Sequence, residues 1–242
     1  MRILAAADLH YSLPQFDWVG ENVGRFDLLV LAGDLLDLGS PVDLDVQELV
    51  VRRYLQKFSA ERMVVASSGN HDIGEPERAG ERVALWLERM KGDAILPDYS
   101  CFEKDGVVIS VCPWWDGPTS KEQTEARLEE DARKEKRVWL WLHHFPPQGT
   151  GVAWTGKADG GDAQVREWIG KYQPDFVFSG HIHHAPFYAK GAWGSQIGKT
   201  WIFNAGRQPG GEPTRIVLDL EARRAEWISA EGIEELDVSA AN

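Results

Sequence analysis

Cysteine is scarce in this chain of 242 residues, which contains only Cys101 and Cys112. Two cysteines allow one disulfide at most, and neither lies in a CxxC pair or in another spacing typical of structural zinc sites. This excludes a disulfide-rich fold and a cysteine-based zinc module. We therefore expect the chain to fold in a reducing compartment.

Positive charge and long apolar runs are also in short supply. The chain has 26 Lys and Arg against 38 Asp and Glu, a net charge of −12, so it lacks the basic surface of a duplex-binding protein. No segment approaches the roughly 20 apolar residues of a membrane span, and the apolar run after Met1 reaches Asp8 too soon for a signal-peptide core. We predict a cytoplasmic protein without duplex nucleic acid or membrane as partner. Nothing in the sequence indicates an oligomeric state.

What the chain does contain is the composition of a globular protein. Hydrophobic residues make up 43% and charged residues 26%, which excludes disordered, collagen-like and coiled-coil classes. A length of 242 residues is close to the size at which a single core stops growing. We predict one domain over residues 1–242, with 237–242 as a small or polar tail that frays.

Short aliphatic runs alternate with amphipathic stretches along the chain. The runs predict strands at residues 2–7, 27–32, 62–67, 107–112, 138–142 and 175–179, and the stretches predict helices at 42–58, 78–90, 121–136 and 163–172. This alternation predicts an α/β layered fold. The tail differs, because 200–204, 214–220 and 223–229 read as successive strands with tight turns, so part of the sheet is expected to be antiparallel.

Residues that can bind metals gather directly after predicted strands, where ligands bind in open α/β sheets. Five clusters follow one another along the chain, namely Asp8-Leu9-His10, Gly33-Asp34-Leu35-Leu36-Asp37, Gly69-Asn70-His71-Asp72, His143-His144-Phe145-Pro146-Pro147 and Gly180-His181-Ile182-His183. All seven histidines, including His184, lie in or beside these clusters, whereas unrelated histidines would be scattered. Carboxylate, amide and imidazole groups are donors that suit Mn, Fe or Zn.

The number of donors exceeds what one ion can bind. Two ions roughly 3.5–4 Å apart, bridged by one carboxylate, would use them, and such a pair clamps an in-line displacement at phosphorus. Asp8 and His10, like His181 and His183, would share one face of a strand because side chains alternate with a period of two. Asn70 would be a neutral oxygen ligand.

Each cluster taken singly has a simpler explanation. Asp8 and Asp34 could cap the helices that follow them, and Gly33 and Gly69 could serve turn geometry alone. Asp37 could be a solvated loop carboxylate. The five clusters together favour a metal site over these separate explanations.

In this order, DLH, GDLLD, GNHD, HxPP and GHIH resemble the motifs of the calcineurin-like metallophosphoesterase superfamily. The resemblance runs from Asp8 to His183, and Asn204-Ala205-Gly206 resembles a later loop of the family. It implies a four-layer α/β sandwich in which two mixed β-sheets are flanked by helices. It also implies two divalent ions, Mn, Fe or Zn, of which we favour Mn.

The resemblance further implies a role for each residue. Asp8, His10 and His183 would bind the first ion, and Asn70, His144 and His181 the second, with Asp34 bridging the two. His71 is implied as the histidine beside the leaving-group oxygen, and Asp37 as the carboxylate that orients it. A strand end could present His143 as well as His144, but the proline register of HxPP favours His144, with His143 and His184 as supporting residues.

These implications predict a metal-dependent phosphoric ester hydrolase. A water bridging the ions would ionise near neutral pH and attack phosphorus in line, and His71 would protonate the leaving alkoxide. Leu38 stands where phosphoprotein phosphatases carry an Arg after GDxxD, which favours a small phosphomonoester or phosphodiester as substrate. The alternatives are a non-catalytic interaction module of the same fold, which would be expected to lack ligands, and a nuclease, which the acidic charge disfavours.

Tryptophan is frequent, with eleven in the chain. Most of those within predicted helices or strands are expected in the core. Trp114, Trp115 and Trp154 follow strand ends instead, and the sequence leaves open whether they contact substrate or belong to the core.

Overall fold

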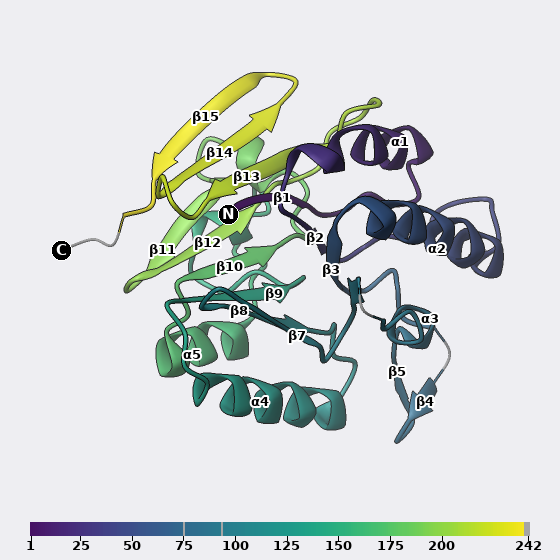
Figure 1. The fold of residues 1–242 in the computed structure, drawn as a ribbon, viewed down its shortest axis with the longest axis horizontal. Coiled ribbons are helices and arrows are strands. Elements are labelled where there is room, and N and C mark those ends of the chain that lie inside the picture. The colour runs from purple at the N-terminus through teal and green to yellow at the C-terminus, as the bar shows by residue number, and fades with distance from the viewer. Residues whose placement is uncertain (75, 93, 240–242) are drawn as a thin grey trace.

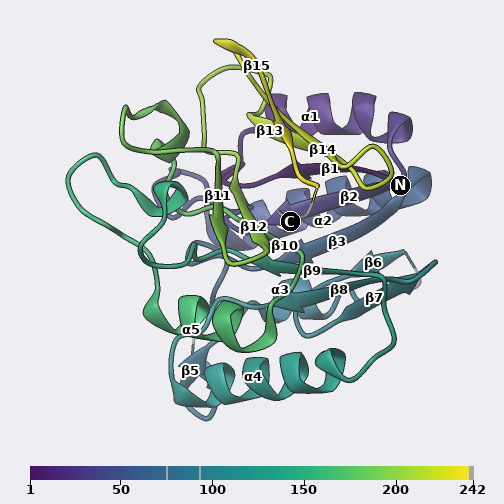
Figure 2. The ribbon, with the colours of Figure 1, turned by 90° about the vertical axis from the view of Figure 1, so that its left-hand side faces the viewer.

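Two large mixed sheets lie face to face between two layers of helices in the computed structural model, which describes residues 1–74, 76–92 and 94–239. Figure 2 shows α1 (Leu13–Asn22) above the sheets and α4 (Pro118–Ala132) and α5 (Ala163–Tyr172) below them. The predicted four-layer α/β sandwich is confirmed.

The seven-stranded sheet has its parallel strands on one side and its antiparallel strands on the other (Figure 1). Its order is β15 (Gly232–Asp237), β14 (Arg224–Ser229), β13 (Arg215–Asp219), β1 (Arg2–Ala6), β2 (Leu28–Ala32), β3 (Met63–Ser67) and β6 (Ile95–Leu96). Strands β1, β2, β3 and β6 pair in parallel, whereas β13, β14 and β15 pair antiparallel. The antiparallel tail is thus confirmed for β13 and β14.

The six-stranded sheet has the order β11 (Gly194–Ile197), β12 (Thr200–Asn204), β10 (Phe176–Ser179), β9 (Val138–His143), β8 (Val107–Cys112) and β7 (Cys101–Lys104). Its four inner strands are parallel, and β11 and β7 run antiparallel at its edges. The sequence grouped β12 with the antiparallel strands β13 and β14. Instead, β12 lies in this second sheet, where it pairs in parallel with β10 and antiparallel with β11.

Three apolar clusters hold the layers together. The first lies between the sheets and includes Val30 and Leu140, both fully buried. The second joins the seven-stranded sheet to α1 and α2 (Leu44–Glu61), with Phe16 and Phe58 at its centre. The third joins the six-stranded sheet to α4 and α5 and includes Trp168. No helix in the described ranges has the length and apolar character needed to cross a membrane.

The predicted helix over 78–90 is largely wrong. Strands β4 (Pro76–Arg78) and β5 (Glu81–Arg82) form a hairpin there, followed only by the single helical turn α3 (Leu85–Glu88). The left-handed residues Ala79 and Gly80 make the turn. The Glu81 carboxylate then accepts hydrogen bonds from the backbone N–H groups of Thr119 and Ser120, 2.6 and 2.8 Å long, and so caps α4. A tertiary contact therefore overrides the helical pattern.

The first residues of the tail predicted to fray make defined contacts. Asp237 ends β15, and Val238 is 2% exposed and donates a hydrogen bond to the carbonyl of Arg223. Residues 240–242, the rest of the tail predicted to fray, lie outside the described residues. Helix α1 and the short strands β6, β7, β11 and β15 were also not predicted from the sequence.

Candidate metal centre

The candidate site lies where β1, β2 and β3 of one sheet and β9 and β10 of the other end. Donor atoms within 4.8 Å of one another form three groups: Asp8, His10, Asp34 and His183; Asp34, His144 and His181; and His10, Asp37 and His71. Asn70 adjoins the second group, because its Oδ1 lies 2.9 Å from His181 Nδ1. The fold thus brings together all the residues implied as metal ligands, with His71 and Asp37 beside them.

The backbone is left-handed at four of these positions. The φ angle is +56° at Asp8, +42° at His10, +52° at Asp34 and +67° at His181. Residues with side chains seldom adopt this conformation, which costs about 1–3 kcal/mol each. Strands β1 and β10 end before these residues, so strand alternation does not explain why the DxH and HxH pairs converge. Strained loops after the strands turn the side chains inward instead.

Two glycines let these loops approach one another. A Cβ atom added at Gly69 would lie 2.2 Å from Asp34 Oδ1, and one added at Gly33 would lie 2.5 Å from His144 Nδ1. Gly33 also has a φ of +83°. Close packing against the donor residues, beyond turn geometry, therefore requires glycine at both positions.

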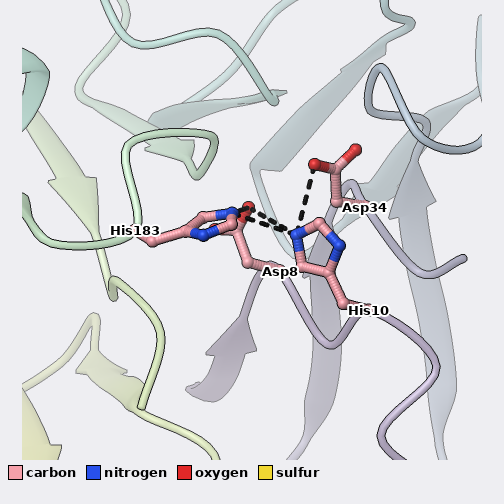
Figure 3. Close-up of side chains that lie close together, drawn as sticks. All are labelled: Asp8, His10, Asp34 and His183. Atoms are coloured by element: carbon pink, nitrogen blue, oxygen red, sulfur yellow. Dashed lines mark hydrogen bonds and ion pairs between the residues drawn. The ribbon is translucent and has the colours of Figure 1, made fainter. Parts of the chain in front are cut away.

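The first donor group consists of Asp8, His10, Asp34 and His183, whose side chains point toward one another (Figure 3). His10 Nε2 lies 3.0 Å from His183 Nε2 and 3.5 Å from Asp34 Oδ2. His183 Nε2 lies 3.3 Å from Asp8 Oδ1. Neighbouring ligands of one ion, each about 2.0–2.2 Å from it, are about 3 Å apart. The spacing of this group therefore suits a shared cation.

The second donor group consists of Asp34, His144 and His181, with Asn70 beside it. His144 Nε2 lies 3.2 Å from Asp34 Oδ2. The same oxygen lies 3.5 Å from His10 Nε2 in the first group. One oxygen of Asp34 therefore faces both groups, the position that a bridging carboxylate would occupy.

Two buried atoms of the site lack a hydrogen-bond partner among the residues described, Asp8 Oδ2 and His144 Nε2. His144 Nδ1 lies 2.6 Å from the carbonyl oxygen of Ala32, to which it can donate, so the neutral ring would direct the lone pair of Nε2 at the second group. A buried polar atom without a partner costs about 1–3 kcal/mol. Divalent ions would satisfy both atoms, so the donor set fits such a centre.

The electrostatics of the site also favour cations. Burial is the main cause that lowers the pKa of both His10 and His181 to about 4, so both rings are neutral at pH 7, the form that binds metals. Burial acts in the same direction on His144, but the carboxylates of Asp34 and Asp8 outweigh it and raise the pKa of His144 to about 9. Burial would raise the pKa of Asp34, yet His144 holds it below its usual range. The carboxylates thus attract positive charge to this position.

The two histidines of the HxPP motif face different surroundings. The ring of His143 lies 4.5 Å from that of Trp115, and its Nδ1 accepts a hydrogen bond from the N–H of Phe145 at 3.0 Å. Burial lowers the pKa of His143 to about 3. The donor group includes His144 and leaves out His143, as the proline register favours. His184 is exposed, with its ring 6.2 Å from that of His183.

His71 and Asp37 lie at the open side of the first donor group. The Nδ1 atom of His71 accepts a hydrogen bond from the N–H of Leu38 at 3.0 Å, and Asp37 Oδ1 lies 3.7 Å from that nitrogen. The N–H of His71 itself donates to Asp34 Oδ1 at 2.8 Å. The backbone of Leu38 therefore orients the ring, and the Asp37 carboxylate adds a negative charge beside it.

Two buried residues hold the loops of the site, although sequence reasoning gave neither a role. Asp72 accepts hydrogen bonds from the N–H groups of Leu35, Leu36 and Gly69, all within 3.2 Å, and so ties the loops after β2 and β3 together. Asn204 donates to the carbonyls of Gly180 and Ile182, both at 3.1 Å, and fixes the GHIH loop. Asp72 belongs to the GNHD motif and Asn204 to the Asn204-Ala205-Gly206 segment, so these motifs carry the sequence signal for both residues.

The sequence left open whether Trp114, Trp115 and Trp154 contact substrate. Of these three, Trp114 borders the site. Its ring lies 5.2 Å from that of His181 and stacks on Phe145 at 4.9 Å. Trp115 packs against His143 and Trp168 instead, with ring distances of 4.5 and 5.3 Å, and belongs to the third apolar cluster. The ring of Trp154 lies 5.7 Å from the Lys190 ammonium.

Comparisons with known proteins agree with this geometry. Residues 1–185 match the family model described as calcineurin-like phosphoesterase. A comparison with curated proteins found no match.

Several solved structures share the fold over nearly the whole chain. The protein TT1561 of Thermus thermophilus has a TM-score of 0.62 at 14% identity, covering 98% of this chain and 99% of that one. A dimetal phosphatase from Danio rerio has a TM-score of 0.54 at 13% identity, covering 100% and 99%. The E. coli phosphoesterase Yfce has a TM-score of 0.50 at 17% identity, covering 99% and 100%. At these identities the likeness shows the fold alone.

Proposed function

The chain belongs to the calcineurin-like phosphoesterase family, and from this we propose that it is a phosphoric ester hydrolase that works with two divalent ions. The observation that carries the proposal is the position of Asp34 Oδ2, within 3.5 Å of an imidazole nitrogen in each donor group. The first ion would be held by Asp8, His10 and His183, the second by Asn70, His144 and His181, and Asp34 would bridge them. Oxygen and imidazole donors without thiolate suit Mn²⁺, which we favour over Fe and Zn.

When bound, the two ions would neutralise charge on the phosphoryl oxygens and lower the pKa of a water that attacks phosphorus. The protein's own contribution to the leaving group would come from His71. Because its Nδ1 accepts from Leu38, the neutral ring would carry its proton on Nε2. Asp37, 3.7 Å from Nδ1, would place its negative charge beside the ring. We assign His71 as the general acid and Asp37 as the carboxylate beside it.

The substrate class that best fits is a small phosphomonoester or phosphodiester. The net charge of −12 opposes binding to duplex nucleic acid, which makes a nuclease the weaker alternative. All the donor positions expected of the family are occupied by residues that can bind metals, which argues against a non-catalytic module of the same fold.

The test is hydrolysis of p-nitrophenyl phosphate and bis(p-nitrophenyl) phosphate by protein stripped with a chelator and then supplied with Mn²⁺, Fe²⁺ or Zn²⁺. We expect stripped protein to be inactive, and Mn²⁺ to restore the most activity. The preferred ester would distinguish a monoesterase from a diesterase. Hydrolysis that survives chelation, or no hydrolysis with any ion, would overturn the proposal, and the second result would favour the non-catalytic module.

A further inference from the structure

A pocket of about 230 Å³ opens directly beside the first donor group. It shares the side chain of His183 with that group, and its other walls include Ser12, Gln15, His184, Arg207 and Gly210. Its volume is several times the roughly 30 Å³ that one water occupies, so it has room for a polar group of a ligand. A substrate whose phosphoryl group lies at the donor groups would therefore have this pocket next to it.

Arg207 gives the pocket a positive charge that no ion pair in the described chain neutralises. The residue is half-buried, and within the described parts of the chain its guanidinium forms no hydrogen bond or ion pair. The backbone N–H of Arg207 donates to the carbonyl of His183 at 2.8 Å, which fixes the residue beside the first donor group. A partly desolvated guanidinium is stabilised by an anion, and its planar donors match a carboxylate or phosphate.

The charge of Arg207 lies beside the site without belonging to it. Arg207 lines the same pocket as His183, a member of the first donor group, and its backbone N–H is bonded to the carbonyl of that residue. However, Arg207 forms no ion pair with Asp8 or Asp34 in the described chain. A cation directly between those carboxylates would also repel metal ions. Arg207 is thus placed to meet an anion next to the reacting phosphoryl group.

The walls of the pocket are held in place before any ligand binds. The buried side chain of Gln15 donates to the carbonyls of Gln208 and Gly210, at 2.9 and 3.3 Å, and so ties α1 to the loop that carries Arg207. The Gln208 side chain in turn accepts from the N–H of Ala230 at 2.7 Å. Ser12 precedes α1 but its hydroxyl does not cap that helix. The pocket is therefore preformed, which lowers the entropy cost of binding.

We propose that this pocket binds a second anionic group of the substrate, a carboxylate or a further phosphate, through Arg207. The inference rests on the proposed function, because it takes the first anionic group to be the phosphoryl group at the donor residues. It narrows the substrate class from any small phosphate ester to esters with a second negative charge near the reacting phosphorus.

The experiment measures binding with matched phosphonates, which cannot be hydrolysed as esters. Calorimetry on the Mn²⁺-loaded protein would compare 3-phosphonopropionate with propylphosphonate, and 4-phosphonobutyrate with butylphosphonate. Within each pair, the two compounds differ only in that a terminal carboxylate replaces a methyl group. We expect the carboxylate to tighten binding about 10- to 100-fold for the better-fitting length, the range of a charged hydrogen bond. Arg207→Ala should remove this preference, Arg207→Lys should keep part of it, and the exposed control Arg53→Ala should leave it unchanged.

Three results would overturn the inference. One is equal affinity for both members of each pair in the unaltered protein. Another is a carboxylate preference that survives Arg207→Ala. The third is an equal loss for both members in Arg207→Ala, which would place the guanidinium on the phosphoryl group itself. The proposed function fails separately, through absence of metal-dependent ester hydrolysis, since phosphonate binding does not depend on turnover.

Discussion

A pocket of about 480 Å³ lies at the edge of the sandwich where the parallel strands begin, whereas the candidate site lies at the edge where they end. The first edge carries both signs of charge, among them Arg62, Lys104, Asp105 and Arg137. Arg62 is satisfied by the carbonyl oxygens of Phe26 and Gly24, at 2.6 and 2.7 Å. The walls of the larger pocket thus include exposed side chains of mixed charge, and the guanidinium of Arg62 there is already hydrogen-bonded.

The edge where the strands end shows the opposite combination. Its pocket is smaller, but four of its donor residues are buried, its backbone is left-handed at four donor residues, and two buried donor atoms lack hydrogen-bond partners in the described chain. Such features cost stability and persist where a function requires them. The comparison teaches that converging metal-binding side chains with unsatisfied atoms identify the candidate site, whereas the volume of the pocket does not.

The largest effect is expected from matched Asp→Asn changes at the two edges. Asp34→Asn removes the charge shared by both donor groups, so we expect loss of nearly all hydrolysis and of metal binding. Asp105→Asn makes the same chemical change at an exposed turn of the other edge and should leave both unchanged. Metal content and turnover of the two purified variants check this. An Asp34→Asn protein that keeps two ions and full turnover would break the comparison.

The next effect concerns His71, which lies in a donor group only with His10 and Asp37. His71→Ala should keep metal occupancy and lower kcat by roughly 10²–10⁴-fold for alkyl phosphates, the range for general acid catalysis. For p-nitrophenyl phosphate the loss should be much smaller, because that leaving group needs little protonation. Equal losses for both esters would mean that His71 positions the phosphoryl group or the ions.

A smaller effect is expected at Asp37, which contacts His71 Nδ1 at 3.7 Å but does not orient it alone, since Leu38 also holds that nitrogen. Asp37→Asn should lower kcat for alkyl phosphates by about tenfold, with little change for aryl phosphates. The double variant with His71→Ala should be no slower than His71→Ala alone, because the two residues act as a unit. Additive losses would place Asp37 outside that unit.

The smallest effect is on stability and involves Asp98, whose Oδ1 accepts from the N–H of Ser68 at 2.9 Å behind the site. Burial raises the pKa of Asp98 from 3.8 to about 7. The folded state therefore binds the proton more tightly than the unfolded state, and this carboxyl destabilises the fold increasingly as pH rises from about 4 to about 7.

Asp98→Asn keeps the acceptor and removes the charge. Its Tm should exceed that of the unaltered protein by about 2–8 °C at pH 8, and by less at pH 5. Asp105→Asn should show no such trend. Thermal unfolding at the two pH values decides the point, and a gain that shrinks as pH rises would contradict the assigned direction.

Much of the fold and of the site could be predicted from the sequence. Buried strands such as β2 and β8 are continuous aliphatic runs, and donors collected after strand ends are visible as motifs. The hairpin β4–β5 was missed because its stability depends on a contact between Glu81 and the distant start of α4. Asp72 was left without a role because its three hydrogen-bond donors come from two loops that only the fold brings together. The role of Arg207 could not be predicted, because it lies outside the motifs and the pocket that it lines is formed by residues distant in the sequence.

The most direct test of the central claim is anomalous X-ray diffraction from crystals of the Mn²⁺-loaded protein. The account predicts two peaks, roughly 3.5–4 Å apart, with Asp34 between them. His10 and His183 should lie at one peak, and His144 and His181 at the other. A single peak, or two peaks that do not share Asp34, would contradict the assignment of a paired metal centre.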